Sequence, residues 1–409
     1  MTSEKQPLEK ELSQKPDELS LAVVVGEMSA DKHVSRLLKQ VSDSMPTLKI
    51  WGVGGNKMQS AGVELLANIE TFSTFGIFEV VKSLPFFAGL RSRLLEEIGK
   101  RKPKALMLVD FGGFNIGLAT KVHKQYPDLP IIYFISPQVW ASRPWRLNPI
   151  ADAVKKMLVI FPFEEAIYRS RGIEAHFVGH PLMEGLPKPD SLCGRQEFAQ
   201  KHKLDANRPI VGIFPGSRKM EISFLMPIII DAVEWLQILR PEIQFVLSRG
   251  NETLGKAIDT QISRLKRNNL LEQGVLRFVE SQDNYELMKN SDILWTKSGT
   301  TTLEAALYAK PMLIFYRGSW ASYPLFMLFK TIKRVGLPNL ISGKGLVPEL
   351  IQLDCRAEQL VKYTVDWLDV PGLRQEVSQE LSLIAAKLGH GDFVKTASDQ
   401  IMETLKCKP

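Results

Sequence analysis

The chain has 409 residues, of which 44% are hydrophobic; this supports two packed domains and excludes a globally disordered protein. Lys and Arg number 52 against 45 Asp and Glu, a formal charge of +7 that fits an anionic partner such as a nucleotide or an anionic membrane surface. The basic residues form no run of five or six, so nucleic acid is disfavoured as a partner.

The N-terminal half begins with a polar tail, 1–18, which lacks the apolar stretch of a signal peptide. No later apolar run is expected to approach the ~20 residues of a membrane span. Four short apolar runs predict buried parallel strands at 21–25, 105–109, 131–135 and 156–161. Helical patterns alternate with them at 31–45, 89–101, 116–125 and 163–171. This alternation predicts a doubly wound α/β domain over 19–184.

The segment 185–208 interrupts this alternation with prolines, glycines and charges, and is predicted to connect two domains through one short helix. Strands follow at 209–214, 243–248, 275–279, 292–296 and 311–316, predicting a second doubly wound domain over 209–370. Residues 371–409 are predicted to form C-terminal helices that pack back. Two such domains suit a pair of substrates bound between them, at the carboxyl ends of the strands.

The first domain carries two polar loops directly after predicted strands. The loop 26–31, GEMSAD, holds Ser29 and Asp31 at a helix start, where they serve either as caps or as contacts to substrate. It is not GxGxxG, so a nicotinamide cofactor is unsupported. Asp110 follows the strand 105–109, beside Gly112 and Gly113. Partial burial there would raise its pKa and make it a general base; the alternative is a helix cap.

The second domain carries two loops suited to an anion. Pro215 to Arg218 is predicted to offer free backbone N–H groups and a guanidinium. The strongest motif is KSGTTTLE, 297–304, where small hydroxyl residues at a helix start would hold a diphosphate and Glu304 would bind ribose hydroxyls. A capping box with Thr301 as the cap is the alternative for these residues, and it is compatible with diphosphate binding.

Two segments mix aromatic and basic residues, 79–95 and 319–333, which favours contact with an acidic lipid surface. Core packing or a dimer interface is the alternative. In the first segment the predicted membrane contacts are Leu84, Phe86, Phe87 and Leu90. No metal site is predicted, because no DxD motif occurs and the pair His176 and His180 falls at a strand end. The far-spaced Cys193, Cys355 and Cys407 indicate a reducing compartment.

Together these motifs resemble the lipid-A-disaccharide synthase family over about residues 20 to 400. Many short motifs agree with that family in order and spacing. They are GEMSAD (26–31), GVGGNKMQSAG (52–62), FGIFEV (75–80), VDFGGFN (109–115), SPQVWASR (136–143), FPFE (161–164), VGHPL (178–182), PGSR (215–218), KSGTTTLEAAL (297–307), LPNLISG (337–343) and LVPELIQ (346–352).

The resemblance implies a GT-B fold and a metal-independent, cofactor-free, inverting transferase. Its implied substrates are UDP-2,3-diacylglucosamine and 2,3-diacylglucosamine 1-phosphate, joined at the inner face of the inner membrane by a cytoplasmic, peripheral protein. The implied catalytic residues are Asp110 and Arg218. The implied substrate-binding residues are Glu27, Ser29, Asp31, Asn115, Gln138, Ser217, Ser298, Gly299, Thr300, Thr301, Glu304 and Asn339. In the family, C-terminal segments are exchanged between subunits, so a homodimer in which Asn339 serves the partner's site is allowed.

Departures from the family pattern occur at Ala30, Gly112, Gly113 and Ser142 and bear on the acceptor side. The alternatives are a divergent GT-B paralogue that uses another UDP-sugar or lipid acceptor, or a catalytically silent protein of the membrane surface. Retention of Asp110 together with Arg218 and Glu304 argues against the silent protein.

Overall fold

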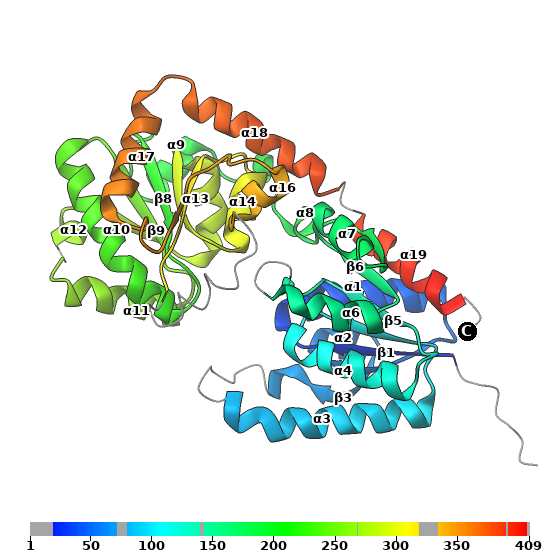
Figure 1. The fold of residues 1–409 in the computed structure, drawn as a ribbon. Helices are drawn as coiled ribbons and strands as arrows, with labels where there is room; N and C mark the ends of the chain where they lie inside the picture. Colours follow the sequence, from blue (N-terminus) through cyan, green and yellow to red (C-terminus); the bar gives the residue numbers. More distant parts are fainter. Residues whose placement is uncertain are drawn as a thin grey trace, which may run out of the picture.

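The structure is a computed structural model that describes residues 19–71, 80–139, 143–267, 269–318, 334–389 and 392–406. Within these ranges the chain forms two α/β domains, each built on one parallel sheet covered by helices (Figure 1). The predicted polar tail 1–18 and the aromatic-basic segment 319–333 lie outside the described residues.

The first sheet has seven strands in the order β3-β2-β1-β4-β5-β6-β7. Its strands are β1 (Ser20–Val25), β2 (Lys49–Gly54), β3 (Glu64–Asn68), β4 (Ala105–Val109), β5 (Ile131–Phe134), β6 (Lys156–Val159) and β7 (Glu174–Phe177). Its helices are α1 (Met28–Ser44), α2 (Asn56–Ser60), α3 (Val80–Arg101), α4 (Gly112–Gln125), α6 (Leu147–Ala153), α7 (Pro162–Arg169) and α8 (Leu182–Gly185). The strands β2, β3 and β7 were not predicted.

The second sheet has six strands in the order β10-β9-β8-β11-β12-β13. Its strands are β8 (Ile210–Phe214), β9 (Gln244–Ser248), β10 (Leu276–Val279), β11 (Ile293–Lys297), β12 (Met312–Tyr316) and β13 (Glu349–Ile351). The helices are α9 (Arg195–Lys201), α10 (Lys219–Leu239), α11 (Glu252–Arg264), α12 (Asn269–Glu272), α13 (Asn284–Asn290), α14 (Thr300–Leu307), α16 (Leu337–Ser342), α17 (Ala357–Asp369), α18 (Leu373–Lys387) and α19 (Phe393–Lys406). Of the strands in this second sheet, only β13 was not predicted from the sequence.

Continuous apolar strands arise because helices cover both faces of each sheet. In β1, Ala22 and Val24 enter the core on one face, whereas Leu21 and Val23 enter the core on the other. Phe161, just after β6, belongs to the core of the second domain. The carboxyl edge of the first sheet therefore borders the second domain.

The last two helices join the domains at their outer side. α18 packs on α14 and α16 of the second domain, and α19 returns to pack on α1 of the first (Figure 1). The buried Lys156 of β6 fixes α19 through an ion pair of 2.8 Å to Glu403. The connecting helix α9 packs on the second domain, where Phe198 is fully buried.

One described helix, α10, is long and apolar enough to cross a membrane by length and composition alone. The expectation that no such run exists is therefore wrong. Half of its apolar window is buried within the protein, and residues such as Leu225, Ile229 and Val233 lie in the second core. This packing gives the apolar composition a role inside the fold.

Candidate active site

The polar loops singled out in the sequence lie at the two places where strand order reverses. In the first sheet β1 and β4 are neighbours, and their carboxyl ends lead into Glu27 and Asp110. In the second sheet β8 and β11 are neighbours, and lead into the loops 215–218 and 298–300. Open parallel sheets bind ligands at these reversal points. The topology therefore gives each domain one binding edge.

Asp110 lies on a strained piece of backbone at the end of β4. Asp110 and Phe111 are consecutive left-handed residues, with φ of 47° and 51°, a conformation that is uncommon for residues other than glycine. The Asp110 carbonyl accepts hydrogen bonds from Tyr133 Oη at 2.6 Å and Asn115 Nδ2 at 3.0 Å. The strain is thus held by buried neighbours, and strain of this kind concentrates at functional sites.

The environment of Asp110 suits a general base. Burial, and next the negative charge of Glu27, raise the pKa of Asp110 to about 6, while a hydrogen bond from the Phe111 backbone opposes the rise. α4 has no side-chain cap, and Phe111 occupies its N-cap position. The alternative reading of Asp110 as the cap of α4 is therefore wrong.

A cavity of about 390 Å³ opens beside Asp110. Gln138 lines this cavity and is exposed. Of the two glycines after Asp110, Gly112 packs closely on Pro137, whereas Gly113 has no atom within 4 Å of an added Cβ. Gly113 is thus the one with open space beside it. The cavity has the size of a small-ligand pocket.

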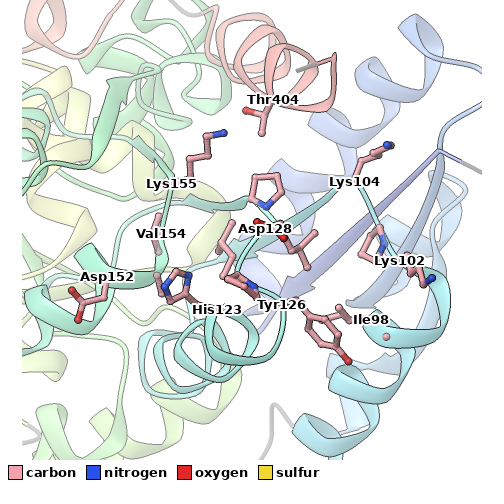
Figure 2. Close-up of a pocket in the computed structure, with 17 residues that line it drawn as sticks. Ile98, Lys102, Lys104, His123, Tyr126, Asp128, Asp152, Val154, Lys155 and Thr404 are labelled. Carbon is pink, nitrogen blue, oxygen red and sulfur yellow. The ribbon is translucent and has the colours of Figure 1, made fainter. Parts of the chain in front are cut away.

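A larger cavity of about 690 Å³ lies at the opposite edge of the first sheet (Figure 2). Its lining includes Lys104, Ile131 and Lys155, at the amino ends of β4, β5 and β6, and Thr404 of α19. Because ligands of such sheets bind at the carboxyl ends of the strands, this cavity is not assigned to the active site despite its size.

In the second domain, the loop 215–218 differs from its sequence prediction. The Glu221 carboxylate accepts hydrogen bonds from the backbone N–H groups of Ser217 at 2.9 Å and Arg218 at 3.2 Å. These two donors are therefore not free for a ligand anion, and the prediction that they would be free is wrong. The side chains of Ser217 and Arg218 remain exposed. The other Glu221 oxygen pairs with Lys297 at 2.8 Å, which joins this loop to the loop after β11.

The start of α14 does offer free donors. Gly299 occupies the N-cap position and the helix begins at Thr300, so the capping box with Thr301 as the cap is wrong. Within the described part of the chain, the backbone N–H groups of Gly299, Thr300 and Thr301 donate to no protein atom, whereas that of Thr302 bonds to the Gly299 carbonyl. Free N–H groups at a helix start attract an anion.

Glu304 lies one turn into α14. Burial raises its pKa, and a hydrogen bond of 3.3 Å from Tyr285 Oη opposes that rise. The Tyr285 ring lies near that of Tyr308, with centroids 6.1 Å apart. Glu304 therefore presents a partly buried acceptor, as hydrogen bonds to sugar hydroxyls would need.

Among the described residues, one cluster has the spacing of metal ligands: His202, Asp283 and Glu286. The Lys201 ammonium lies 2.6 Å from the Asp283 carboxylate and 2.9 Å from that of Glu286. The Lys201 ammonium thus already pairs with both carboxylates of the cluster, and we assign no metal to it.

Comparison with known proteins gives the family. A family model described as lipid-A-disaccharide synthetase matches residues 21–388. The lipid-A-disaccharide synthase 1 of Legionella pneumophila is 34% identical over 374 residues, 91% of this chain and 94% of that protein. The lipid-A-disaccharide synthase of Geobacter sulfurreducens is 34% identical over 385 residues, 94% of this chain and 97% of that protein.

The chain belongs to the lipid-A-disaccharide synthase family. It is accordingly a glycosyltransferase of lipid A disaccharide synthesis. A solved structure, UDP-GlcNAc 2-epimerase from Neisseria meningitidis bound to UDP-GlcNAc, aligns with a TM-score of 0.60 over 94% of this chain and 100% of the other, at 12% identity. That likeness concerns the fold alone. The two parallel-sheet domains confirm the predicted GT-B fold of this family member.

Three residues predicted to bind substrate in this lipid-A-disaccharide synthase are instead buried supports. Asp31 accepts bonds from the backbone N–H groups of Gly55, Lys57 and Met58 at 2.8–3.3 Å. Asn115 Nδ2 donates to backbone carbonyls, including that of Asp110. Asn339 Nδ2 donates to the Val347 carbonyl and to Glu349, both at 2.8 Å. All three side chains are at most 2% exposed. The prediction that they contact substrate directly is therefore wrong, and they instead hold the backbone of the site in place.

The scaffold role of Asp31 predicts a stability defect. Asp31→Ala leaves three backbone donors of the α2 start without their acceptor, so we expect the free energy of unfolding to fall by about 2–4 kcal/mol. Urea unfolding of the purified protein measures this. Asp43→Ala is the matched control, because among the described residues Asp43 pairs only with exposed Lys39, and such i,i+4 helix pairs contribute about 0.3–0.5 kcal/mol. Equal effects of the two substitutions would contradict the assignment.

The described part of the predicted membrane segment 79–95 lies in α3 (Val80–Arg101). Phe86 is 42% exposed, whereas Phe87 packs edge-on against Phe111 at 5.8 Å between centroids. Leu90 is 7% exposed and lies in the first core, so its predicted membrane contact is wrong. The side chain of Leu84 lies outside the described part. Phe86 alone of the four is described with a large exposed side chain.

Proposed function

We propose that this chain transfers 2,3-diacylglucosamine from UDP to the 6-hydroxyl of 2,3-diacylglucosamine 1-phosphate, with inversion at the anomeric carbon. The products are the lipid A disaccharide 1-phosphate and UDP. Family membership supports the general reaction. The observation that carries the proposed displacement is the position of Asp110, a half-buried carboxyl group at the reversal point of the first sheet and on the lining of a cavity, where burial raises its pKa to about 6. The two substrates are those that the family resemblance implies.

In this proposal the second domain binds the UDP group of the donor. The free N–H groups at the start of α14 and the exposed Arg218 guanidinium face the diphosphate, and the side chains of Ser298, Thr300 and Thr301 add hydroxyl donors. Glu304 accepts hydrogen bonds from the ribose. These groups stabilise the negative charge that develops on departing UDP, which is usually the largest contribution to such catalysis.

The first domain binds the acceptor, with Glu27, Ser29 and Gln138 at its binding edge. Asp110 removes the proton from the attacking 6-hydroxyl as that oxygen displaces UDP from the anomeric carbon. A single displacement of this kind inverts the anomeric configuration. General-base assistance requires the hydroxyl to come within about 2.6–3.2 Å of the carboxylate.

The decisive experiment is an assay of the purified chain with the two acylated substrates. Mass spectrometry is expected to show the disaccharide 1-phosphate, and proton NMR of its new linkage an inverted anomeric centre. Turnover is expected to persist in chelator, because the sequence lacks DxD. Absence of the disaccharide sinks the proposal, transfer to another acceptor favours a paralogue, and chelator-sensitive loss restored by magnesium sinks the metal-free mechanism.

We further propose that the protein works in the cytoplasm on the inner-membrane surface, since both sugars carry acyl chains, and that α3 contacts the lipid. Phe86→Ser is expected to weaken binding to anionic liposomes while UDP affinity stays unchanged, because burying one aromatic side chain contributes about 1.5–3 kcal/mol. Liposome flotation measures the effect.

A matched control exists for Phe86. Trp235→Ser removes an aromatic side chain that is also 42% exposed, on α10 of the second domain, and is expected to leave flotation unchanged. Loss of flotation in both variants, or in neither, would count against α3 as the contact. Sedimentation at several protein concentrations would test the homodimer that the family resemblance allows.

A further inference from the structure

The cavity beside Asp110 is lined by two arginines that were not among the predicted site residues, although Arg143 is the last residue of the motif SPQVWASR. Arg143 and Arg146 line it together with Gln138 and Gly113. They flank the short 3-10 turn Pro144–Arg146, which leads into α6. The cavity therefore combines the proposed base with two positive charges, of which Arg143 is exposed and Arg146 is half-buried.

Neither guanidinium is neutralised by the described part of the protein. No ion pair or side-chain hydrogen bond joins Arg143 or Arg146 to a described residue, whereas Arg195 makes four hydrogen bonds in the second domain. Burial, and next the charge of Arg143, lower the pKa of Arg146, so the two positive charges lie close enough to repel each other. An anion between them would remove that repulsion.

Asp110 is not the missing counterion. Its pKa is raised, and the groups that shift it are the burial of the carboxyl, Glu27 and the Phe111 backbone. An arginine paired with Asp110 would instead lower that pKa. All three residues line the cavity, and among the described residues Asp110 forms no ion pair with either arginine.

Hydrogen bonds within the protein hold the described part of the wall beside the arginines. Ser136 Oγ donates to the buried Glu164 at 2.6 Å, and Tyr168 Oη donates to the Pro137 carbonyl at 3.1 Å. The Arg143 N–H bonds to the Val139 carbonyl at 2.7 Å. A preformed wall reduces the ordering cost of binding.

We propose that Arg143 and Arg146 form the binding site for a phosphate monoester on the sugar acceptor. Arginine suits this role because its planar fork of donors matches phosphate oxygens. Anchoring the phosphate in one part of the cavity and the attacking hydroxyl at Asp110 in another would select the acceptor and its orientation. This inference rests on the proposed function.

Steady-state kinetics with two acceptors test it. One acceptor is 2,3-diacylglucosamine 1-phosphate and the other is the same sugar with a free 1-hydroxyl. Arg143→Gln and Arg146→Gln are each expected to raise KM for the phosphorylated acceptor about 10- to 100-fold, with no change for the neutral one or for the UDP donor. Arg143→Lys should recover part of the loss, and Lys124→Gln, an exposed charge on α4, should change nothing.

Three outcomes for the arginine variants would overturn the site. The first is an equal loss on both acceptors, and the second is unchanged kinetics. The third is weaker flotation with anionic phosphatidylglycerol vesicles without the change in KM for the phosphorylated acceptor. If the wild-type protein forms no disaccharide from either acceptor, the proposed function fails. In that case calorimetry tests the phosphate site independently of turnover. Binding of glucosamine 1-phosphate but not glucosamine, abolished in both arginine variants and retained in Lys124→Gln, would support it, and no such difference would reject it.

Discussion

Asp110→Asn is expected to lower kcat by about 10²–10⁴-fold, the usual contribution of general-base catalysis. Asparagine keeps the shape of the side chain and tolerates the left-handed conformation that Asp110 adopts at φ 47°, so the fold should survive. UDP affinity should stay unchanged, because the proposed nucleotide site lies on the other domain. Turnover and UDP calorimetry on the same preparation measure both quantities.

The pH dependence offers a second view of the same residue. Asp110 acts as a base only when ionised, and its pKa is raised to about 6. The kcat/KM of the wild-type protein should therefore fall as pH drops through about 6, and this limb should vanish in Asp110→Asn. Glu27→Gln removes a negative charge that raises this pKa, so the limb should move to lower pH. Near-normal turnover of Asp110→Asn would place the base on the loop that follows β1.

Arg218→Gln is expected to reduce kcat/KM by about 10²–10³-fold, the range found when one electrostatic donor to a developing charge is removed. The substitution keeps the backbone N–H that bonds to Glu221 at 3.2 Å, so the loop geometry should persist. Affinity for the UDP-sugar donor should weaken less than turnover, because the additional negative charge on the diphosphate develops only as the sugar–phosphate bond breaks.

The control for Arg218 is Arg264→Gln, an exposed arginine near the end of α11 in the same domain. It removes the same charge at a distance from the reversal point and should leave both kcat/KM and UDP affinity unchanged. Similar losses in the two variants would mean that net charge matters, and an unaffected Arg218→Gln would remove Arg218 from the proposed chemistry.

The sequence by itself determined the fold class and the placement of the main loops. Central parallel strands such as β1 and β4 are buried on both faces, so they appear as uninterrupted apolar runs. The strands that escaped prediction are of another kind. β3, β7 and β13 lie at sheet edges with partly exposed residues, and β2 contains two glycines, so none forms a long apolar run.

In the second domain, the occupied N–H groups of the loop 215–218 also follow from a local sequence rule. Glu221 stands three residues after Arg218, the spacing at which an acidic side chain bonds back to the start of its own helix. That local rule already predicts that the N–H groups of Ser217 and Arg218 are occupied. The free donors at the start of α14 follow from Gly299, which has no side chain to cap them.

Only the tertiary structure decided which polar residues support the site and which face it. Asp31 is separated by 24 residues from Gly55, the first N–H it binds, and Tyr133 by 23 from the Asp110 carbonyl it holds. A polar side chain in a loop looks alike in sequence whether it turns inward to such a partner or outward to a ligand. That no described residue pairs with Arg143 or Arg146 is likewise a property of their surroundings, since a charge becomes available to a ligand only where the fold brings no counterion to it.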